Sequence, residues 1–168
     1  MYLLWTIFNF IFIIIFSALV LTVIAKGKKV FLQKYSIAAV VILTVGIIGF
    51  FNNRESESKN VFELPTDGEF VGRTSKRIAT IIEDNALFDV RLSVRFREQF
   101  NGELSPVLTR SSLSGYIGNF NWTSDHVEID KLDNGKYSYS VSGVMDWYFL
   151  NMKVYSQPKE YIGTLVVQ

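Results

Sequence analysis

Residues 2–51 read YLLWTIFNFIFIIIFSALVLTVIAKGKKVFLQKYSIAAVVILTVGIIGFF, and this stretch decides how the chain is organised. It contains two runs without a charged side chain, at residues 2–25 and 35–51, joined by a connection rich in lysine. A membrane-spanning helix needs about 20 apolar residues to cross roughly 30 Å of hydrocarbon. The first run has that length, and the second reaches it only if its aromatic ends lie in the interface. We therefore predict a transmembrane helical hairpin over residues 1–51.

Polar and small residues within these runs bear on how the helices pack. Asn9 either lies in the membrane interface or finds a partner, such as a second helix. Gly46 and Gly49 form a small-residue step that lets another helix approach closely. No Lys or Arg precedes Lys26, so the first run lacks the basic start of a secretory signal peptide, and we expect a retained helix.

Lysines in the connection bear on orientation. Short loops rich in Lys and Arg stay in the cytoplasm. Four lysines between the runs therefore favour a C-terminal part outside the cytoplasm, whereas basic residues after the second run weaken that assignment. The sequence predicts a multi-pass membrane protein and leaves the side of its C-terminal part open. The lysines are Lys26, Lys28, Lys29 and Lys34, and the opposing residues are Arg54, Arg73, Lys76 and Arg77.

Composition limits what the remainder can do. The chain has 168 residues and a formal net charge of +1, yet all its acidic residues lie at or after Glu55. The C-terminal part is therefore mildly acidic, unlike the basic surfaces that bind nucleic acid polymers. The absence of cysteine excludes disulfides, thiolate metal sites and cysteine nucleophiles. Residues 52–60 are polar and short, which predicts a linker, and residues 61–168 suffice for one small domain.

The C-terminal part has the pattern of β-strands. Apolar and polar residues alternate over residues 88–96, as in a strand with one buried face. Asn101 with Gly102 and Asn134 with Gly135 are typical hairpin turns, and Gly143 suggests a bulge or bend. We expect further strands at residues 113–120, 127–129, 137–141, 147–154 and 161–167, with a turn at residues 157–158.

Residues 75–87 allow two interpretations. Ile78, Ile81 and Ile82 have helical spacing, whereas Ile78, Thr80 and Ile82 would share one face of a strand that turns at residues 84–85. We favour the strand because β-branched residues dominate the segment. Six to eight short strands then predict a small closed antiparallel β-barrel, with a β-sandwich as the alternative.

Arginines on the best-defined strand are the strongest candidates for ligand binding. Arg91, Arg95 and Arg97 share one face, and guanidinium groups suit phosphates and carboxylates. In a barrel with a partly polar inner wall, Arg91 and Arg95 could hold an anionic ligand; alternatively they lie on an exposed face beside acidic neighbours. Tyr139 and Trp147 could stack on a base or simply fill the core. The predicted ligand-binding residues are Arg91, Arg95, Tyr139 and Trp147.

The sequence offers no catalytic or metal-binding residues. His126 is the single histidine, and its acidic neighbours suggest either a metal-binding or acid–base role or, as we favour, a solvated strand edge. HExxH, paired-cysteine, phosphate-loop and GxSxG motifs are absent. We therefore expect neither an enzyme nor a bound cofactor.

Two short motifs carry a resemblance to a known family. Residues 67–72 (DGEFVG) resemble the opening Gly-x-aromatic-x-Gly strand of small calycin-like barrels, and residues 161–165 (YIGTL) resemble their closing strand. With two membrane helices in front, the chain resembles the two-transmembrane β-barrel effectors of bacterial antiphage signalling, of the CBASS Cap15 type and of Panoptes-like systems. The resemblance implies a cytoplasmic barrel that binds a cyclic dinucleotide. It also implies helices that form homo-oligomers and disrupt the bacterial inner membrane.

A second function fits the same residues. The chain could be a membrane-anchored extracytoplasmic β module with a role as a scaffold or in envelope assembly. That function needs no ligand pocket and predicts a filled core.

Overall fold

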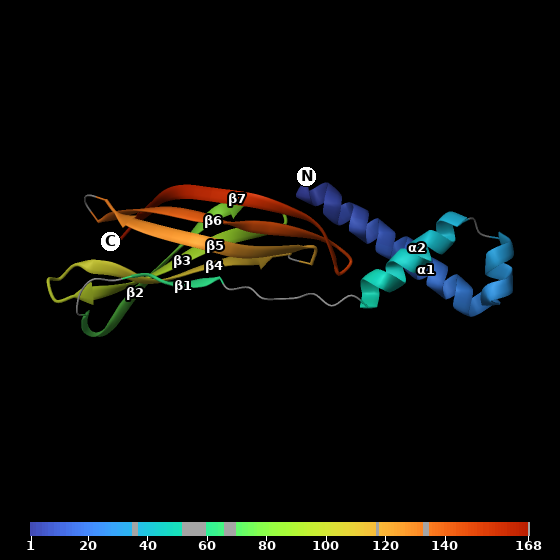
Figure 1. Cartoon of the computed structure of the whole chain (residues 1–168), viewed down its shortest axis with the longest axis horizontal. Coiled ribbons are helices and arrows are strands. Elements are labelled where there is room, and N and C mark those ends of the chain that lie inside the picture. The colour runs from blue at the N-terminus through green and yellow to red at the C-terminus, as the bar shows by residue number, and fades with distance from the viewer. Residues whose placement is uncertain (35–36, 52–59, 66–69, 117, 133–134, 168) are drawn as a thin grey trace. The chain divides into compact units, whose positions relative to one another are not determined.

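The computed structural model describes residues 1–34, 37–51, 60–65, 70–116, 118–132 and 135–167, with side chains except at 26–34, 50–51 and 71–74. Within these residues the chain forms two helices followed by seven strands (Figure 1). The helices are α1 (Tyr2–Lys34) and α2 (Ile37–Phe51). The strands are β1 (Val61–Glu63), β2 (Phe70–Asp84), β3 (Phe88–Gln99), β4 (Leu104–Gly115), β5 (Phe120–Lys131), β6 (Lys136–Phe149) and β7 (Met152–Val166).

The chain divides into two compact units. The first comprises Met1–Glu55 and Tyr148–Val154, which are the two helices and the end of the β6–β7 hairpin. The second comprises Ser56–Trp147 and Tyr155–Gln168. The predicted domain limits at 51, 60 and 61 stay a prediction. The predicted linker apart from Asn60, the first half of the 67–72 motif and Asn134 lie outside the described residues.

In the first unit, α1 is an apolar helix long enough to cross a membrane. Its 33 residues extend about 50 Å at 1.5 Å per residue. The apolar part, Tyr2–Ala25, has 24 residues and is mostly exposed. Among the described residues no other helix is both apolar and long enough, since α2 has 15 residues. A second crossing through α2 therefore stays a prediction.

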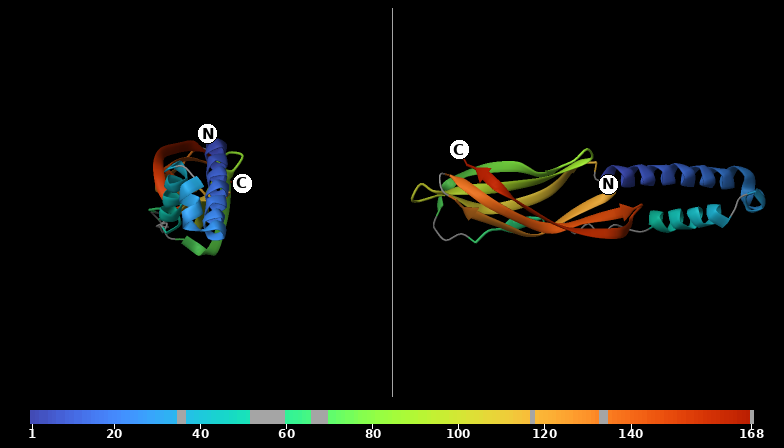
Figure 2. Two further views of the ribbon diagram at one scale, coloured as in Figure 1. Left: turned by 90° about the vertical axis from the view of Figure 1, so that its right-hand side faces the viewer. Right: turned by 90° about the horizontal axis from the view of Figure 1, so that it is seen from above.

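The two helices pack side by side through small and branched apolar residues (Figure 2). Leu19 of α1 and Ala39 of α2 are buried where the helices meet. Farther along α2, a side chain at Gly46 would collide with the ring of Phe16. The glycine predicted to let another helix approach thus accommodates α1 of the same chain.

The second unit contains two antiparallel sheets, and the prediction of a mainly-β domain is confirmed. One sheet has the strand order β1-β4-β3-β2, and the other has the order β5-β6-β7. The orange and red strands β5 to β7 lie over the green and yellow strands of the first sheet (Figures 1 and 2). The described strands form two sheets rather than one ring, so closure into a barrel stays a prediction.

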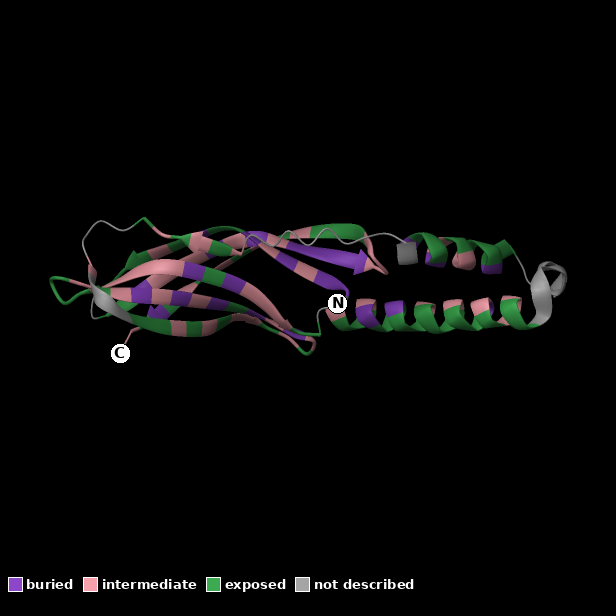
Figure 3. Ribbon diagram, turned by 90° about the horizontal axis from the view of Figure 1, so that it is seen from below, coloured by how far each residue is buried: buried purple, intermediate pink, exposed green. Residues whose placement is uncertain are grey.

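Aromatic residues from both sheets fill the space between them. The predicted alternation in β3 is confirmed, because residues 88, 90, 92, 94 and 96 are buried and those between them are not. Phe88 packs against Phe120, and Phe96 against Tyr137, with ring centroids 5.1 and 4.9 Å apart. Each buried phenylalanine contributes about 2 kcal/mol through removal from water. Figure 3 shows the alternation along the strands and the mostly exposed helices.

Residues 75–84 form the second half of β2, so the strand interpretation is confirmed. The chain then turns at Asn85, whose Oδ1 accepts hydrogen bonds from the backbone N–H groups of Leu87 and Phe88. The helical spacing of the isoleucines was misleading. Pairing with β3 decides the conformation here, and the sequence of one segment does not reveal its pairing partner.

The first predicted hairpin turn is also confirmed. Gly102 has a φ of 80°, which glycine adopts without strain, and its N–H bonds to the carbonyl of Gln99. The predicted irregularity at Gly143 lies on the opposite strand, where the register shifts between Ser124 and His126. Gly143 itself allows the close approach of Thr123, whose carbonyl oxygen would collide with a side chain there.

Two of the predicted strands and one predicted turn were wrong. Residues 147–154 form no single strand, because β6 ends at Phe149 and β7 begins at Met152. No turn occurs at residues 157–158, since β7 continues through them. Pro158 is tolerated because β7 is an edge strand, where one side of the backbone needs no partner strand. Residues 113–120 likewise form no single strand, because β4 ends at Gly115 and β5 begins at Phe120.

Candidate anion-binding face

The four predicted ligand-binding residues lie on two different surfaces. Arg91 and Arg95 point outward from β3, on the face opposite the core. Trp147 is buried on the inner face of the other sheet, where its ring meets those of Phe120 and Tyr155. Tyr139 is also turned inward, against Gly163 of β7. The structure therefore does not bring the arginines and the aromatic residues together.

Arg91 is paired with an acidic neighbour. Its Nη2 lies 3.0 Å from Oδ2 of Asp89 on the same strand, and half of the Arg91 side chain is exposed. An exposed pair of this kind contributes little to stability. It does reduce the positive charge that Arg91 offers to a ligand.

Arg95 lies in a different environment, beside two further arginines. Arg77 of β2 is directly opposite Arg95 in the strand register. Arg110 of β4 is opposite Ser93, one position along the same face. All three line one hollow of about 340 Å³. We call Arg77, Arg95 and Arg110 the arginine face.

Within the described part of the chain, the arginine face has no acidic partner at salt-bridge distance. Among the described residues, no carboxylate forms a salt bridge with Arg77, Arg95 or Arg110. Like charges directly opposite each other destabilise a sheet. Three guanidinium groups around one hollow therefore form a site that a phosphate or carboxylate would stabilise.

A second hollow of about 610 Å³ adjoins the first and shares Arg95 with it. It also contains Arg97, whose guanidinium carbon lies 5.3 Å from the ring centre of Phe70. The aromatic contact holds Arg97 in place, and Glu63 adds one acidic group to the rim. Arg95 thus belongs to both hollows, while Arg91 lines neither.

Sequence reasoning missed Arg77 and Arg110 as site residues. In the sequence, Arg77 stands out only as a basic residue near the membrane. The strand through Ile78, Thr80 and Ile82 already implied an outward Arg77, so a signal existed for that residue. Arg110 reaches the site because β4 pairs with β3, and the sequence around Arg110 does not reveal that pairing.

His126 lies away from this face. It is exposed on β5 and lines a third hollow of about 420 Å³ together with Glu128, Asp130 and Tyr137. Burial raises the pKa of the Tyr137 phenol, whose O–H donates to the carbonyl of Leu104. No group of His, Cys, Asp and Glu among the described residues could hold a metal ion.

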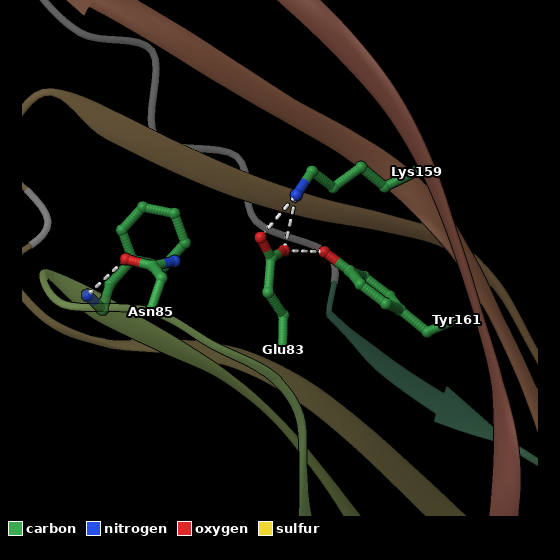
Figure 4. Close-up of polar contacts among 5 residues, drawn as sticks. Glu83, Asn85, Lys159 and Tyr161 are labelled. Atoms are coloured by element: carbon green, nitrogen blue, oxygen red, sulfur yellow. Dashed lines mark hydrogen bonds and ion pairs between the residues drawn. The ribbon is translucent and has the colours of Figure 1, made fainter. Parts of the chain in front are cut away.

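Another polar cluster, away from the arginine face, joins the two sheets (Figure 4). Nζ of Lys159 on β7 lies 2.6 Å from both carboxylate oxygens of Glu83 on β2, and the Tyr161 hydroxyl bonds to the same carboxylate. Both charged side chains are largely buried, at 14% and 17% exposed. The carboxylate is satisfied by its partners, so this cluster ties the sheets together and offers no open site.

Comparison with known proteins gives no assignment for this chain: no protein family model, curated protein or solved structure matches it.

Proposed function

We propose that this chain is a membrane-anchored sensor or effector whose β domain binds a phosphate-bearing ligand on the arginine face. One observation carries the proposal: Arg77 and Arg95 are opposite each other, with Arg110 at the same hollow and no carboxylate paired with any of them among the described residues. Such a cluster costs free energy unless an anion occupies it. Arginine pairs are also the preferred protein groups for bidentate phosphate recognition.

Membrane anchoring is the second part of the proposal. α1 supplies one crossing, and α2 returns the chain as a shorter second crossing in a bacterial inner membrane. Short apolar helices are accommodated by local thinning of the bilayer and by flanking side chains. The apolar surface that α1 leaves exposed supports this placement.

A cyclic dinucleotide is the ligand that this face suits best. Such a ligand carries two phosphates, and the adjoining hollows provide two cationic positions that share Arg95. The resemblance to antiphage effectors names the same ligand class. Tyr139 and Trp147 have no part in this version of the site, because both pack inside the domain.

We extend the proposal to closure of the two sheets into one barrel. Side chains bridge both gaps between them. Glu83 meets Lys159 on one side. On the other, the Asn60 side chain bonds to the backbone of Trp122 and Ser124. Ligand binding would then alter how the helices of several copies associate, and assembly would disrupt the inner membrane.

The test is calorimetric titration of the full chain in nanodiscs of neutral lipid, with cyclic dinucleotides, a linear dinucleotide and inorganic phosphate. Loss of a charge-assisted hydrogen bond costs about 1.5–3 kcal/mol, so Arg95→Gln or Arg110→Gln should weaken binding at least about tenfold. Arg91→Gln is the matched control, because Arg91 is paired with Asp89 and lines neither hollow. Equal effects of R91Q and R95Q, or no binding by the wild-type chain, would refute the proposal.

A second candidate function is favoured by the filled core. Phe88, Phe96 and Trp122 are fully buried between the sheets, as expected for an extracytoplasmic scaffold module without an internal ligand site. The two functions differ in the side of the membrane. A topology reporter fused after Gln168 that is active only in the periplasm would exclude a cytoplasmic nucleotide as the ligand and favour the scaffold.

A further inference from the structure

The β6–β7 turn has an unusual composition for a hairpin. Its segment Tyr148–Val154 reads YFLNMKV, whereas surface turns are rich in Gly, Asn, Asp, Pro and Ser. Leu150 has a φ of 52°, a conformation that non-glycine residues other than Asn and Asp rarely adopt. An apolar turn with a strained leucine must be held by its surroundings.

The first turns of α1 hold this segment. The ring of Phe149 packs against Phe12 with centroids 4.7 Å apart, and against Phe8 and Trp5 at 5.6 and 6.2 Å. The turn thus contacts residues 5–12 of α1. These residues come before Phe16, the residue of α1 that packs against Gly46 of α2.

The turn lies where α2 ends. A Cβ at Gly49, near the end of α2, would lie 2.6 Å from Cδ1 of Leu150. The apolar part of α2, Ile37–Gly49, is about 20 Å long, whereas that of α1 is about 36 Å. The β6–β7 turn therefore covers a portion of α1 that α2 is too short to reach.

Backbone groups of the turn receive partners from α1. The indole N–H of Trp5 donates to the carbonyl of Tyr148 at 3.0 Å, and Oδ1 of Asn9 accepts from the N–H of Leu150 at 3.4 Å. Asn9 is only 1% exposed. In the hydrocarbon region every backbone polar group needs a partner within the protein, because water is absent. A water-exposed turn would not need such partners.

The surface around the turn is exposed and mostly apolar, and its one charged side chain, Lys153, is of the kind that reaches from a membrane boundary into water. We infer that the segment Tyr148–Val154 lies in the membrane boundary together with the first three turns of α1, and that lipid is its partner. This inference rests on the membrane anchoring proposed above. If α1 is in the bilayer from Tyr2 onward, a turn packed on Phe8 and Phe12 lies there as well. The exposed apolar side chains include Leu3, Leu4, Ile7 and Ile11 of α1 and Val154 of the turn segment.

The absence of cysteine makes the inference directly testable. Single cysteines at Met152, Leu21 and Ile162 are labelled with an environment-sensitive fluorophore in the full chain, which is then reconstituted into vesicles containing nitroxide-labelled lipids. Leu21 on α1 is the membrane reference. Ile162 is the matched control, since it lies on the same strand and the same face as Met152, about 33 Å farther along.

We expect quenching at Met152 within about twofold of that at Leu21, and at least about threefold stronger than at Ile162, because boundary segments lie roughly 5–10 Å deep. Val154→Cys should behave like Met152→Cys, which guards against a local effect of one label. Strong quenching at Leu21 with Met152 equal to Ile162 overturns this inference and leaves the anchoring intact. No quenching at Leu21 overturns the anchoring, and this inference with it.

Discussion

The hairpin turn between β3 and β4 and the one between β6 and β7 make the same kind of connection by opposite means. In the first, Gly102 supplies the positive φ, and Oδ1 of Asn101 accepts from the N–H of Glu103. In the second, Leu150 takes the positive φ, and its N–H is bonded by Asn9 of α1. One turn carries its own stabilising groups, whereas the other takes them from a helix 141 residues away in sequence.

This contrast shows what the composition of a turn reports. A polar turn such as residues 101–103 is suited to water and forms from local chemistry. An apolar turn such as residues 149–152 is stable only where another apolar surface covers it. The second turn should therefore depend on α1 for its stability, whereas the first should not.

The largest expected effect is that of removing the aromatic anchor of the apolar turn. Phe149→Ala should lower the stability of the full chain by about 2 kcal/mol, because the ring packs against Phe8 and Phe12 and is partly buried. Phe100→Ala is the matched control beside the polar turn, where the ring is 70% exposed, and it should change stability by less than about 0.5 kcal/mol. Thermal unfolding in detergent micelles, followed by near-UV circular dichroism, measures both. Equal effects would show that the two turns do not differ in their dependence on packing.

The same contrast explains how much the sequence predicts. Asn101 and Gly102 were recognised because a turn of that kind depends on its own residues. The turn at Leu150 was missed because its stabilising groups, Trp5 and Asn9, are remote in sequence and only the fold brings them close. The arginine face divides in the same way: alternation predicted that Arg95 shares a face with Arg91, but strand pairing added Arg110. Local patterns thus predicted strands and faces, and long-range pairing decided the rest.

A smaller effect is expected from crowding the contact between α2 and the apolar turn. Gly49→Ala should cost about 1–1.5 kcal/mol, the lower part of the range for overpacking, since its new methyl group would lie 2.6 Å from Leu150. Gly102→Ala should also cost about 1 kcal/mol, but for a different reason. Nothing lies within 4 Å of the added methyl group, so the cost comes from the left-handed backbone conformation. The double variant Gly49→Ala/Leu150→Ala tests whether the cost of Gly49→Ala comes from a collision with Leu150. If it does, the double variant should be more stable than the sum of the two single changes predicts. Strict additivity of the two changes would argue against a direct contact.

A further prediction concerns the hydrogen bond that Asn9 provides to the turn. Asn9→Ala leaves the Leu150 N–H without its side-chain acceptor, at a cost of about 1 kcal/mol. Amide hydrogen exchange at Leu150 should then be about fivefold to tenfold faster, since 1.4 kcal/mol corresponds to a factor of ten. Asn101→Ala should accelerate exchange at Glu103 less, because that exposed amide can bond to water instead. Unchanged exchange at Leu150 in N9A would mean that the bond does not form in the membrane-bound protein.

The smallest expected effect is a difference in how the two turns respond to pH. Ionisable contacts surround the polar turn: burial raises the pKa of Tyr137, which bonds to Leu104, and a hydrogen bond to Glu103 raises the pKa of Lys131. The unfolded values are 10.0 and 10.5, so the stabilisation is complete below pH 10 and is lost as pH rises through the higher folded values.

Stability should therefore fall at alkaline pH, and Tyr137→Phe should remove most of the fall because Lys131 is exposed and screened by solvent. Exchange should accelerate with pH at Glu103 beyond the intrinsic base-catalysed increase, and at Leu150 only by that increase, because the apolar turn bonds to Asn9 and Trp5, which do not titrate. A pH-dependent loss of protection at Leu150 that matches the loss at Glu103 would show that the two turns open together. The contrast between a self-sufficient turn and a dependent one would then not extend to their dynamics.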